Sequence, residues 1–471
     1  MYTKPKGCYD LYGMRAKKWQ YVNKLIDSLM EKYNYQYIRT PIFEASEVFH
    51  RGIGDSTDIV RKETYDFIDR GDRSMTLRPE GTAGVVRSFV ENKMHGDAIQ
   101  PVKFYYNGTM YRYERPQSGR DRELTQFGVE VLGSDEATVD AEVISIPVNL
   151  FKLLGLNEIK VNINSLGDKE SRDNHRKALV DYFKPHIKDL CPDCQERYLK
   201  NPLRILDCKV DRENEILKNA PVTMDYLNED SKKRFDEVKE YLALLEVDYV
   251  IDPKLVRGLD YYNHVVFEIE AKVDGFGSNN VLAAGGRYNG LVNLLGGPET
   301  AGIGFGMGIG RVIQALELEK VELPVIDDVE IFVMYVSETE KKYALTLTQS
   351  LRMIGFRVEM EYASKGLKAQ FKKADRLNSK YLIILNDEDL ANDEINIKNN
   401  KTKEETKIST DYLLYFFDEA LSEEDCGCDN DHDHGCGDDC HCGEDHECNC
   451  NEECECDDNH GCHCNHNHEE E

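Results

Sequence analysis

Three stretches of the first 320 residues hold charged and polar side chains at a density that an apolar core would not tolerate. They are residues 77–82 (LRPEGT), residues 255–262 (LVRGLDYY), and residues 111–117 (YRYERPQ) with Arg120, Arg122, Gln126 and Glu130 behind them. Gln126 and Glu130 share one face of the strand expected at 124–132, because side chains alternate along a strand. Buried polar groups need partners, so this face predicts either a ligand site or a structural ion-pair network with Arg112.

Glycines alternate with other residues from Gly302 to Gly310, after the sequence AGGRY at 284–288. Such spacing lets a flat ligand or a second backbone approach closely, and a tightly packed strand–helix junction would need it as well. No Gly-Lys-Ser/Thr follows, which excludes a Walker loop. The N-terminal region also lacks the strand–GxGxxG–helix pattern of a dinucleotide site.

The formal charge of −29 is distributed unevenly along the 471 residues. Residues 422–471 hold 19 Asp and Glu and no Lys or Arg, so the residues before them carry −10, which still allows a basic groove for phosphates. The sequence has neither an apolar run of about 18 residues nor an apolar signal region at its start, so we expect a cytoplasmic protein without membrane spans. Eleven of the 15 cysteines lie in the same final segment, which favours reduced thiols over a disulfide framework.

The hydrophobic pattern predicts the elements that must position these groups. A helical stripe covers residues 14–33, and a strand at 35–40 stops at Pro41. Further strands are predicted at 102–114, 124–132, 264–270 and 281–284, and the charged, helix-forming residues 168–250 look like an insertion.

From residue 329 the pattern changes to alternating strands and helices. Strands are predicted at 329–336, 356–361 and 381–385, with a helix near 367–377. Another helix opens with a capping box at 337–340 and ends at Gly355. This order predicts a small, largely parallel sheet with helices on its faces, followed by a closing helix at 412–421.

Over about residues 1–421 the chain resembles the class II aminoacyl-tRNA synthetases, and among them the histidyl-tRNA synthetases. Residues 6–10 (KGCYD) are similar to the family's N-terminal signature, Pro41 to its motif 1 proline, and Arg112 and Glu114 to its motif 2 pair; residues 304–311, ending in Arg311, are similar to motif 3. RGLDYY at 257–262 and AGGRY at 284–288 resemble signatures of the histidyl branch. The resemblance implies an α+β catalytic domain at 1–320, built on an antiparallel sheet with a helical insertion at about 168–250, and an α/β anticodon-binding domain at 325–421.

The resemblance further implies ATP-dependent ligation of L-histidine to tRNA(His) through a histidyl-adenylate, with Mg²⁺ as a cofactor and a homodimer as the assembly. It assigns to histidine binding Glu80, Gly81, Thr82, Arg112, Gln126, Glu130, Arg257, Tyr261 and Tyr262. The acidic and polar members would hold the α-ammonium group, and the tyrosines would line the imidazole pocket, with the ring side as an alternative for Glu130.

The same resemblance implies that Arg112, Glu114 and Arg311 bind ATP. Arg112 and Arg257 would be catalytic, because fixed cations stabilise the charge that develops on the α-phosphate. Loop residues Gln117, Arg120 and Arg122 would contact the tRNA acceptor stem. The chain departs from the family pattern at 123–125, where Glu-Leu-Thr stands in place of Gln-Phe-His. In the anticodon-binding domain, candidates for phosphate contact or for a solvated helix face are Lys365, Lys368, Lys372, Lys373 and Arg376.

Two groups of cysteines lie outside these motifs. Cys191, Cys194 and Cys208 are one thiol short of a closed zinc site, which favours a structural role, with zinc as the alternative. Residues 422–471 carry C-x-C pairs mixed with histidines, and these ligands suit zinc, copper or nickel. We expect a disordered, metal-binding tail, with a plain acidic solubility tail as the alternative. Its candidate ligands are Cys426, Cys428, Cys436, Cys440, His441, Cys442, Cys448, Cys450, Cys454, Cys456, Cys462, His463 and Cys464.

Two other functions compete with the ligase. The first is a catalytically silent, histidine-binding paralogue that regulates histidine biosynthesis; such paralogues usually lose the 257–262 signature and the anticodon-binding domain, and this chain has both. The second is a metal-storage protein on a borrowed scaffold, which explains only residues 422–471. The sequence favours the ligase.

Overall fold

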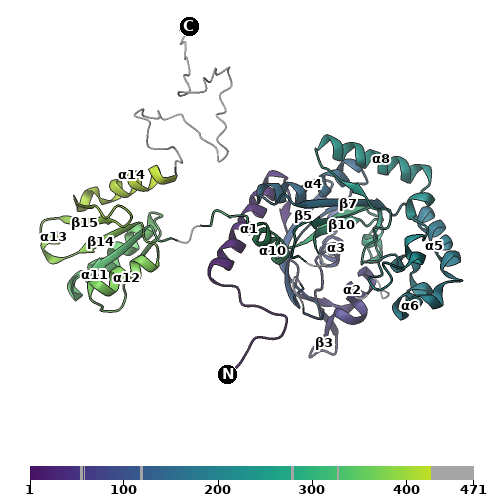
Figure 1. The fold of residues 1–471 in the computed structure, drawn as a ribbon, viewed down its shortest axis with the longest axis horizontal. Helices are drawn as coiled ribbons and strands as arrows, with labels where there is room; N and C mark the ends of the chain where they lie inside the picture. Colours follow the sequence, from purple (N-terminus) through teal and green to yellow (C-terminus); the bar gives the residue numbers. More distant parts are fainter. Residues whose placement is uncertain (54–56, 58, 117–119, 277–279, 326–327, 426–471) are drawn as a thin grey trace, which may run out of the picture. The chain divides into compact units, whose positions relative to one another are not determined.

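The computed structural model describes the chain except for residues 54–56, 58, 117–119, 277–279, 326–327 and 426–471 (Figure 1). The chain divides into two compact units, of which the first spans Met1–Asp327 and the second begins at Asp328. Within the described residues, no helix combines the length and the apolar character needed to span a membrane.

The first unit is built on an eight-stranded mixed sheet in the order β1-β5-β6-β11-β10-β9-β7-β8. The six inner strands pair in antiparallel fashion, and they are β5 (Val102–Tyr111), β6 (Glu123–Leu132), β7 (Ile159–Ser165), β9 (Asn263–Ala271), β10 (Val281–Arg287) and β11 (Gly302–Gly308). The short edge strands β1 (Gln36–Tyr37) and β8 (Val250–Ile251) pair in parallel. The predicted antiparallel sheet is thus confirmed at its centre, while long connections to the edges make the whole sheet mixed.

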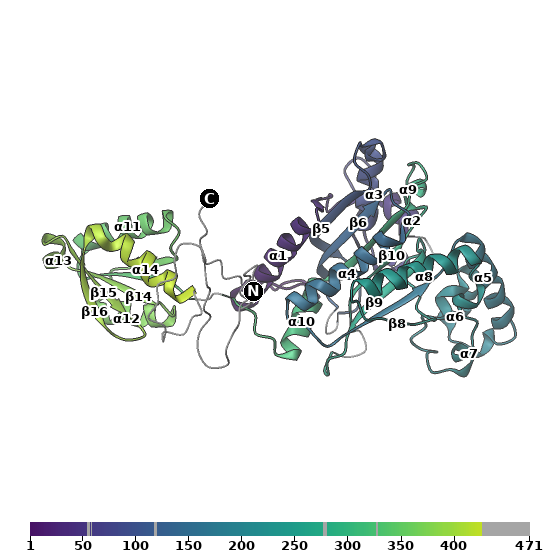
Figure 2. The ribbon, with the colours of Figure 1, turned by 90° about the horizontal axis from the view of Figure 1, so that it is seen from above.

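Four helices cover one face of this sheet and form its main core. They are α1 (Gly13–Lys32), α4 (Ala137–Leu153), α8 (Glu229–Leu244) and α10 (Ile309–Glu319), and α4 and α8 lie side by side (Figure 2). The predicted stripe of α1 is buried at Trp19, Val22, Ile26 and Leu29. Phe127 and Val129 of β6 join this core, so Gln126 and Glu130, in alternation with them, point to the opposite face.

The opposite face carries α3 (Thr82–Glu91) and α9 (Leu291–Leu294), whose apolar side chains form a second core. Beside it, a three-stranded antiparallel sheet contains β2 (Phe43–Ala45), β4 (Ser74–Leu77) and β3 (Tyr65–Ile68), and α2 (Ser46–Ile53) follows β2. The helical insertion begins with α5 (Lys169–Phe183), α6 (Pro192–Lys200) and α7 (Glu215–Lys218), and α8 returns the chain to the main core.

A fully buried carboxylate, that of Asp140, connects the insertion to the sheet. Arg287 of β10 donates from Nε to Asp140 Oδ1 of α4 at 2.7 Å, and Arg234 of α8 donates from Nη2 to Asp140 Oδ2 at 3.0 Å. Burial raises the pKa of Asp140, while the two guanidinium groups oppose that rise. Arg287 belongs to the AGGRY signature, so this part of the signature has a structural role.

The second unit contains a five-stranded sheet in the order β13-β12-β14-β15-β16. The parallel strands β12 (Ile331–Tyr335), β13 (Val358–Met360) and β14 (Tyr381–Leu385) confirm the predicted strands, but the sequence missed the antiparallel β15 (Glu394–Asn399) and β16 (Glu405–Ser409). The edge strand β16 is polar and largely exposed, so its hydrophobic pattern is weak, whereas β15 is short and buries only Ile395 and Ile397.

Helices α11 (Glu338–Met353), α12 (Leu367–Arg376), α13 (Asp387–Ala391) and α14 (Leu413–Asp425) complete the second unit. Ser337 and Glu340 form the predicted capping box at the start of α11. Gly355 follows that helix with a φ of +113°, a conformation that favours glycine.

Candidate active site

A cavity of about 640 Å³ in the first unit collects most of the predicted site residues. Strands β6, β10 and β11 contribute to its lining, and so does the start of α10. The predicted residues that line it are Glu80, Thr82, Arg112, Glu114, Arg120, Gln126, Arg257, Tyr261, Tyr262 and Arg311. Gly81, the N-cap of α3, and the buried Glu130 are adjacent in the structure without lining the cavity.

Two buried carboxylates mark one end of the site. Glu80 accepts backbone N–H groups of Thr82 at 2.7 Å and Ala83 at 2.9 Å, at the N-terminus of α3. Glu130 accepts the hydroxyl of Thr82 at 2.6 Å and that of Tyr288 at 2.5 Å. Burial raises the pKa of Glu80 and raises that of Glu130 well above its ordinary value. This end therefore favours a cation that would compensate the buried negative charge.

The structural alternative for Glu130, an ion pair with Arg112, is not what forms. Glu130 accepts hydroxyl groups instead, and Arg112 donates from Nε to the carbonyl oxygen of Pro79 at 2.8 Å. The polar face of β6 thus keeps its carboxylate apart from the nearby guanidinium groups.

Tyrosine rings enclose the same end of the cavity. The ring of Tyr261 lies 4.6 Å from that of Tyr262 and 5.7 Å from that of Tyr288, measured between centroids. The Tyr261 hydroxyl is buried and makes no hydrogen bond of good geometry with the residues that the structure describes. Tyr106, which the sequence did not single out, donates to Gln126 Oε1 at 3.3 Å. Tyr106 lies on β5 opposite Gly128, and this position beside a glycine was the one indication that its side chain belongs to the site.

The alternating glycines make room for the polar side chains of the neighbouring strand. In the register of β11 against β6, Gly304 lies opposite Glu130 and Gly308 opposite Gln126. A Cβ atom on Gly304 would overlap the Glu130 carboxylate, and one on Gly306 would overlap the Gln126 amide. Close packing between strands is therefore the reason for glycine at 304 and 306, and Gly306 lines the cavity together with Gly308 and Gly310.

Guanidinium groups gather at another part of the cavity wall. Glu114 Oε2 lies 3.2 Å from Arg120 Nη1, and Glu114 Oε1 lies 3.9 Å from Arg112 Nη1. Arg311 donates from Nη1 to the carbonyl oxygen of Val281 at 2.8 Å. Burial, with the charges of Arg120 and Arg112, lowers the pKa of Arg311 to about 10. Three cations against one carboxylate leave an excess of positive charge suited to a polyphosphate.

Arg257 is held by contacts on both its side chain and its backbone. Its guanidinium pairs with Glu268 of β9, a partner that the sequence did not indicate. Its carbonyl oxygen accepts Arg204 Nη1 at 2.8 Å, and Asp260 Oδ1 accepts Asn201 Nδ2 at 2.9 Å. The segment that carries the two tyrosines is thus tied to the helical insertion.

The predicted tRNA contacts are dispersed. Arg120 lines the cavity, whereas Arg122 donates to the carbonyl oxygen of Glu114 at 3.1 Å and lies 3.9 Å from the ring centroid of Tyr113. Gln117 and all the predicted tail ligands lie outside the described residues. Leu124 and Thr125, at the departure from the family pattern, line the cavity.

In the second unit, Lys365, Lys368, Lys372 and Arg376 are exposed. Lys373 is half-buried, and it donates to the carbonyl oxygen of Met360 at 3.0 Å. The exposed side chains keep both predicted roles, phosphate contact and a solvated face, whereas Lys373 has a structural contact.

We predict that Glu130→Gln stabilises the ligand-free protein. The folded-state pKa of Glu130 is raised. The wild-type protein therefore loses stability as pH rises from the unfolded-state pKa of this carboxyl, about 4.3, through its folded-state pKa. The variant lacks this penalty, and its amide can still bond to Thr82 and Tyr288. Thermal denaturation should therefore show a higher midpoint for the variant at pH 8, with the difference shrinking toward pH 4. The exposed Glu240→Gln is the control, and a lower midpoint for Glu130→Gln at pH 8 would contradict the prediction.

Comparisons with known proteins agree with this geometry. The family model for histidyl-tRNA synthetase matches residues 7–312, and that for the anticodon binding domain matches residues 330–419. The histidine–tRNA ligase of Anoxybacillus flavithermus is 52% identical over 405 residues, covering 86% of this chain and 96% of the relative. That of a Geobacillus species is 51% identical over 418 residues, covering 89% and 99%.

A solved structure shows the same architecture. The apo histidyl-tRNA synthetase of S. aureus matches with a TM-score of 0.77 and 41% identity, covering 88% of this chain and 100% of that one. With the sheet, the cavity and both domain matches in agreement, the chain belongs to the histidyl-tRNA synthetase family of class II aminoacyl-tRNA synthetases.

Proposed function

We propose that the cavity joins L-histidine to tRNA(His) in two steps. The histidine carboxylate attacks the α-phosphorus of ATP in line with the leaving pyrophosphate, forming histidyl-adenylate. A hydroxyl of the terminal tRNA ribose then attacks the histidyl carbonyl carbon, and AMP leaves. The observation that carries this proposal is a single cavity with buried acids and tyrosines in one part and clustered guanidinium groups in another.

Histidine fits the acidic end of the cavity. Its α-ammonium group is a compact cation that Glu80, Thr82 and Gln126 would hold through oxygen atoms lining the cavity. The imidazole would lie against the rings of Tyr261 and Tyr262, which line the cavity. The buried Tyr261 hydroxyl can donate to or accept from a ring nitrogen. Glu130, which accepts the hydroxyl groups of both Thr82 and Tyr288, would support this pocket from behind its lining.

ATP fits the guanidinium cluster. Arg112 would bind the α-phosphate, Arg311 would pair with or stack on the nucleotide, and Glu114 would orient the adenine end. Arg120 extends this positive wall, so its proposed tRNA role would place the acceptor end at the cavity. Mg²⁺ is a hard cation with oxygen ligands, and it would accompany the pyrophosphate oxygens.

Arg112 and Arg257 would perform the catalytic stabilisation. Negative charge develops on the α-phosphate oxygens as the carboxylate attacks, and fixed cations lower the barrier without reorganising at that moment. The ion pair with Glu268 and the backbone bond from Arg204 hold Arg257 at the cavity before ATP binds.

We expect Arg257→Gln to lower kcat for histidine-dependent ATP–pyrophosphate exchange by about 100- to 1000-fold, because loss of one such donor costs about 2.7–4 kcal/mol. Exchange with each amino acid in turn, followed by charging of tRNA(His), measures both the activity and its specificity. Arg376→Gln, exposed on α12, is the matched control and should keep wild-type exchange. A wild-type protein that exchanges pyrophosphate with another amino acid, or with none, would refute the proposed function.

The regulatory paralogue is not favoured. Arg257, Tyr261 and Tyr262 line the cavity together, and the anticodon binding domain model matches residues 330–419. A protein that only senses histidine requires neither a cationic wall for ATP nor an anticodon-binding domain.

We also propose a homodimer, as the motif 1 resemblance implies. Directly after Pro41, Ile42 and Phe43 are 42% and 50% exposed, and Phe43 lies 5.9 Å from Phe67, which is 41% exposed. Such adjacent apolar side chains are typical of protein interfaces. Sedimentation velocity should give twice the chain mass for the wild type, and Phe43→Ser with Phe67→Ser should shift the population toward monomer. A monomeric wild type at assay concentrations would overturn this assembly.

For residues 422–471 we propose binding of soft or borderline metal ions such as zinc, copper or nickel. The supporting observation is the sequence itself, since an acidic solubility tail has no need of 11 thiols. Removing these residues should reduce the metal bound per chain while leaving aminoacylation intact if the tail only stores metal. If metal changes the aminoacylation rate of the full chain but not that of the truncated chain, the tail regulates activity. Unchanged metal content after truncation would end the proposal.

A further inference from the structure

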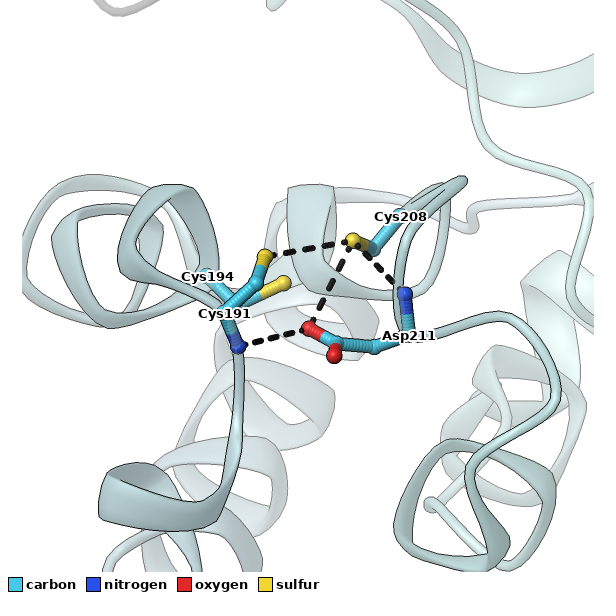
Figure 3. Close-up of side chains that lie close together, drawn as sticks. All are labelled: Cys191, Cys194, Cys208 and Asp211. Carbon is cyan, nitrogen blue, oxygen red and sulfur yellow. Dashed lines mark hydrogen bonds between the residues drawn. The ribbon is translucent and has the colours of Figure 1, made fainter.

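Three cysteines and an aspartate meet inside the helical insertion, away from the catalytic cavity (Figure 3). Cys191 is the N-cap of α6, Cys194 lies in its first turn, and Cys208 follows a short 3₁₀ helix at Pro202–Ile205. Asp211 comes three residues later and supplies a carboxylate beside the sulfur atoms. One ligand atom from each of the four residues lies within 4.8 Å of the others.

The distances suit a tetrahedral ion. Cys191 Sγ and Cys208 Sγ are 3.6 Å apart, and Cys208 Sγ is 3.6 Å from Asp211 Oδ2. With Zn–S bonds of about 2.3 Å, tetrahedral geometry separates two sulfur ligands by roughly 3.8 Å. The cluster is therefore already close to the size that an ion of this kind would impose.

We propose that Cys191, Cys194, Cys208 and Asp211 form a structural zinc site. Four protein ligands complete a tetrahedral shell and leave no open position for a substrate, as in structural rather than catalytic zinc sites. Three thiols select a borderline-soft cation over the hard Mg²⁺. The sequence alone left the site one ligand short, because a single aspartate in a charged segment carries no indication that it faces the thiols.

The surrounding backbone holds the ligands in place. Asp211 Oδ2 accepts the N–H of Cys191 at 3.0 Å, and the N–H of Asp211 donates to Cys208 Sγ at 3.4 Å. Pro192 begins α6, so Cys191 and Cys194 lie about one turn apart at the N-terminal end of that helix. Cys194 and Cys208 are buried in a small core with apolar side chains such as Ile205. Small cores of this kind gain much from a metal cross-link.

A disulfide explains the cluster less well. A bond between Cys191 and Cys208 would need the sulfur atoms to approach to about 2.05 Å. It would also leave Cys194 and Asp211 unexplained. Zinc uses all four groups and requires no oxidant.

The site also lies behind part of the histidine pocket. The segment between Cys194 and Cys208 carries Asn201 and Arg204, which bond to Asp260 and to the backbone of Arg257. An ion that fixes both ends of this segment would therefore fix the support of the 257–262 signature. The proposed zinc site stands independently of the catalytic assignment, because its readouts are metal binding and thiol protection.

The test is cysteine alkylation of the full chain, resolved by peptide. Trypsin places Cys191 and Cys194 in peptide 189–197, Cys208 in 205–209 and Cys8 in 7–15; residues 408–471 contain no Lys or Arg, so the tail thiols stay in a separate fragment. Reduced protein is treated with zinc in excess over all of its thiols, so that the tail is saturated as well, or with a chelator, and is then alkylated. We expect zinc to protect Cys191, Cys194 and Cys208 together, while Cys8 reacts equally in both samples. Equal alkylation of the three thiols with zinc and with chelator would overturn the proposal. If untreated protein gains reactive thiols on addition of a reductant alone, with no chelator, the proposal is overturned as well, because the cysteines were then joined in a disulfide.

Substitutions at Asp211 separate ligation from folding. Asp211→Asn removes the anionic oxygen at nearly constant size and should lose protection at equal zinc concentration, whereas Asp211→Cys supplies a fourth thiolate and should retain it. The second variant shows whether position 211 tolerates change. Full protection in Asp211→Asn, or loss in both variants with the fold intact by circular dichroism, would show that this residue is not a ligand.

Discussion

A carboxylate without access to water is the constraint around which the catalytic unit is organised. Glu130 lies on an inner strand with no exposed surface, and its burial is tolerated because Thr82 and Tyr288 donate to its two oxygens. The opposing strand must present Gly304, since any side chain there would occupy the space of the carboxylate. The glycine-rich strand, the helix that begins at Thr82 and the AGGRY signature are thus parts of one packing arrangement.

The acids and the guanidinium groups lie in different parts of the cavity because they come from the ends of different elements. The acids come from the start of α3 and from β6, while the guanidinium groups come from the end of β5, the loop after it and the start of α10. Arg112 and Arg120 share Glu114, and Arg257 has Glu268, so the cations are positioned without neutralising the buried acids. A zwitterionic amino acid and a polyphosphate can then occupy one cavity side by side.

The helical insertion contributes more than bulk to this arrangement. Arg234 of α8 shares Asp140 with Arg287, and Arg204 and Asn201 hold the segment of Arg257 and Asp260 from behind. Its own apolar core is small, which makes a cross-link through three thiols and a carboxylate physically reasonable. The insertion therefore connects the proposed metal site to the segment that carries Arg257 and Asp260.

Sequence periodicity was sufficient for the buried helix α1, the central strands, the capped helix α11 and the polar face of β6, because each carries a strong local pattern. The motif residues were equally visible, since their types and order are local. What periodicity could not supply was contact between distant segments: the pairing of Arg257 with Glu268, the hydroxyls of Thr82 and Tyr288 on Glu130, and Asp211 beside the thiols. The edge strand β16, which is largely exposed, and the short strand β15, which buries only Ile395 and Ile397, also escaped. Only the folded chain decides such partners, because each depends on register and packing between elements far apart in sequence.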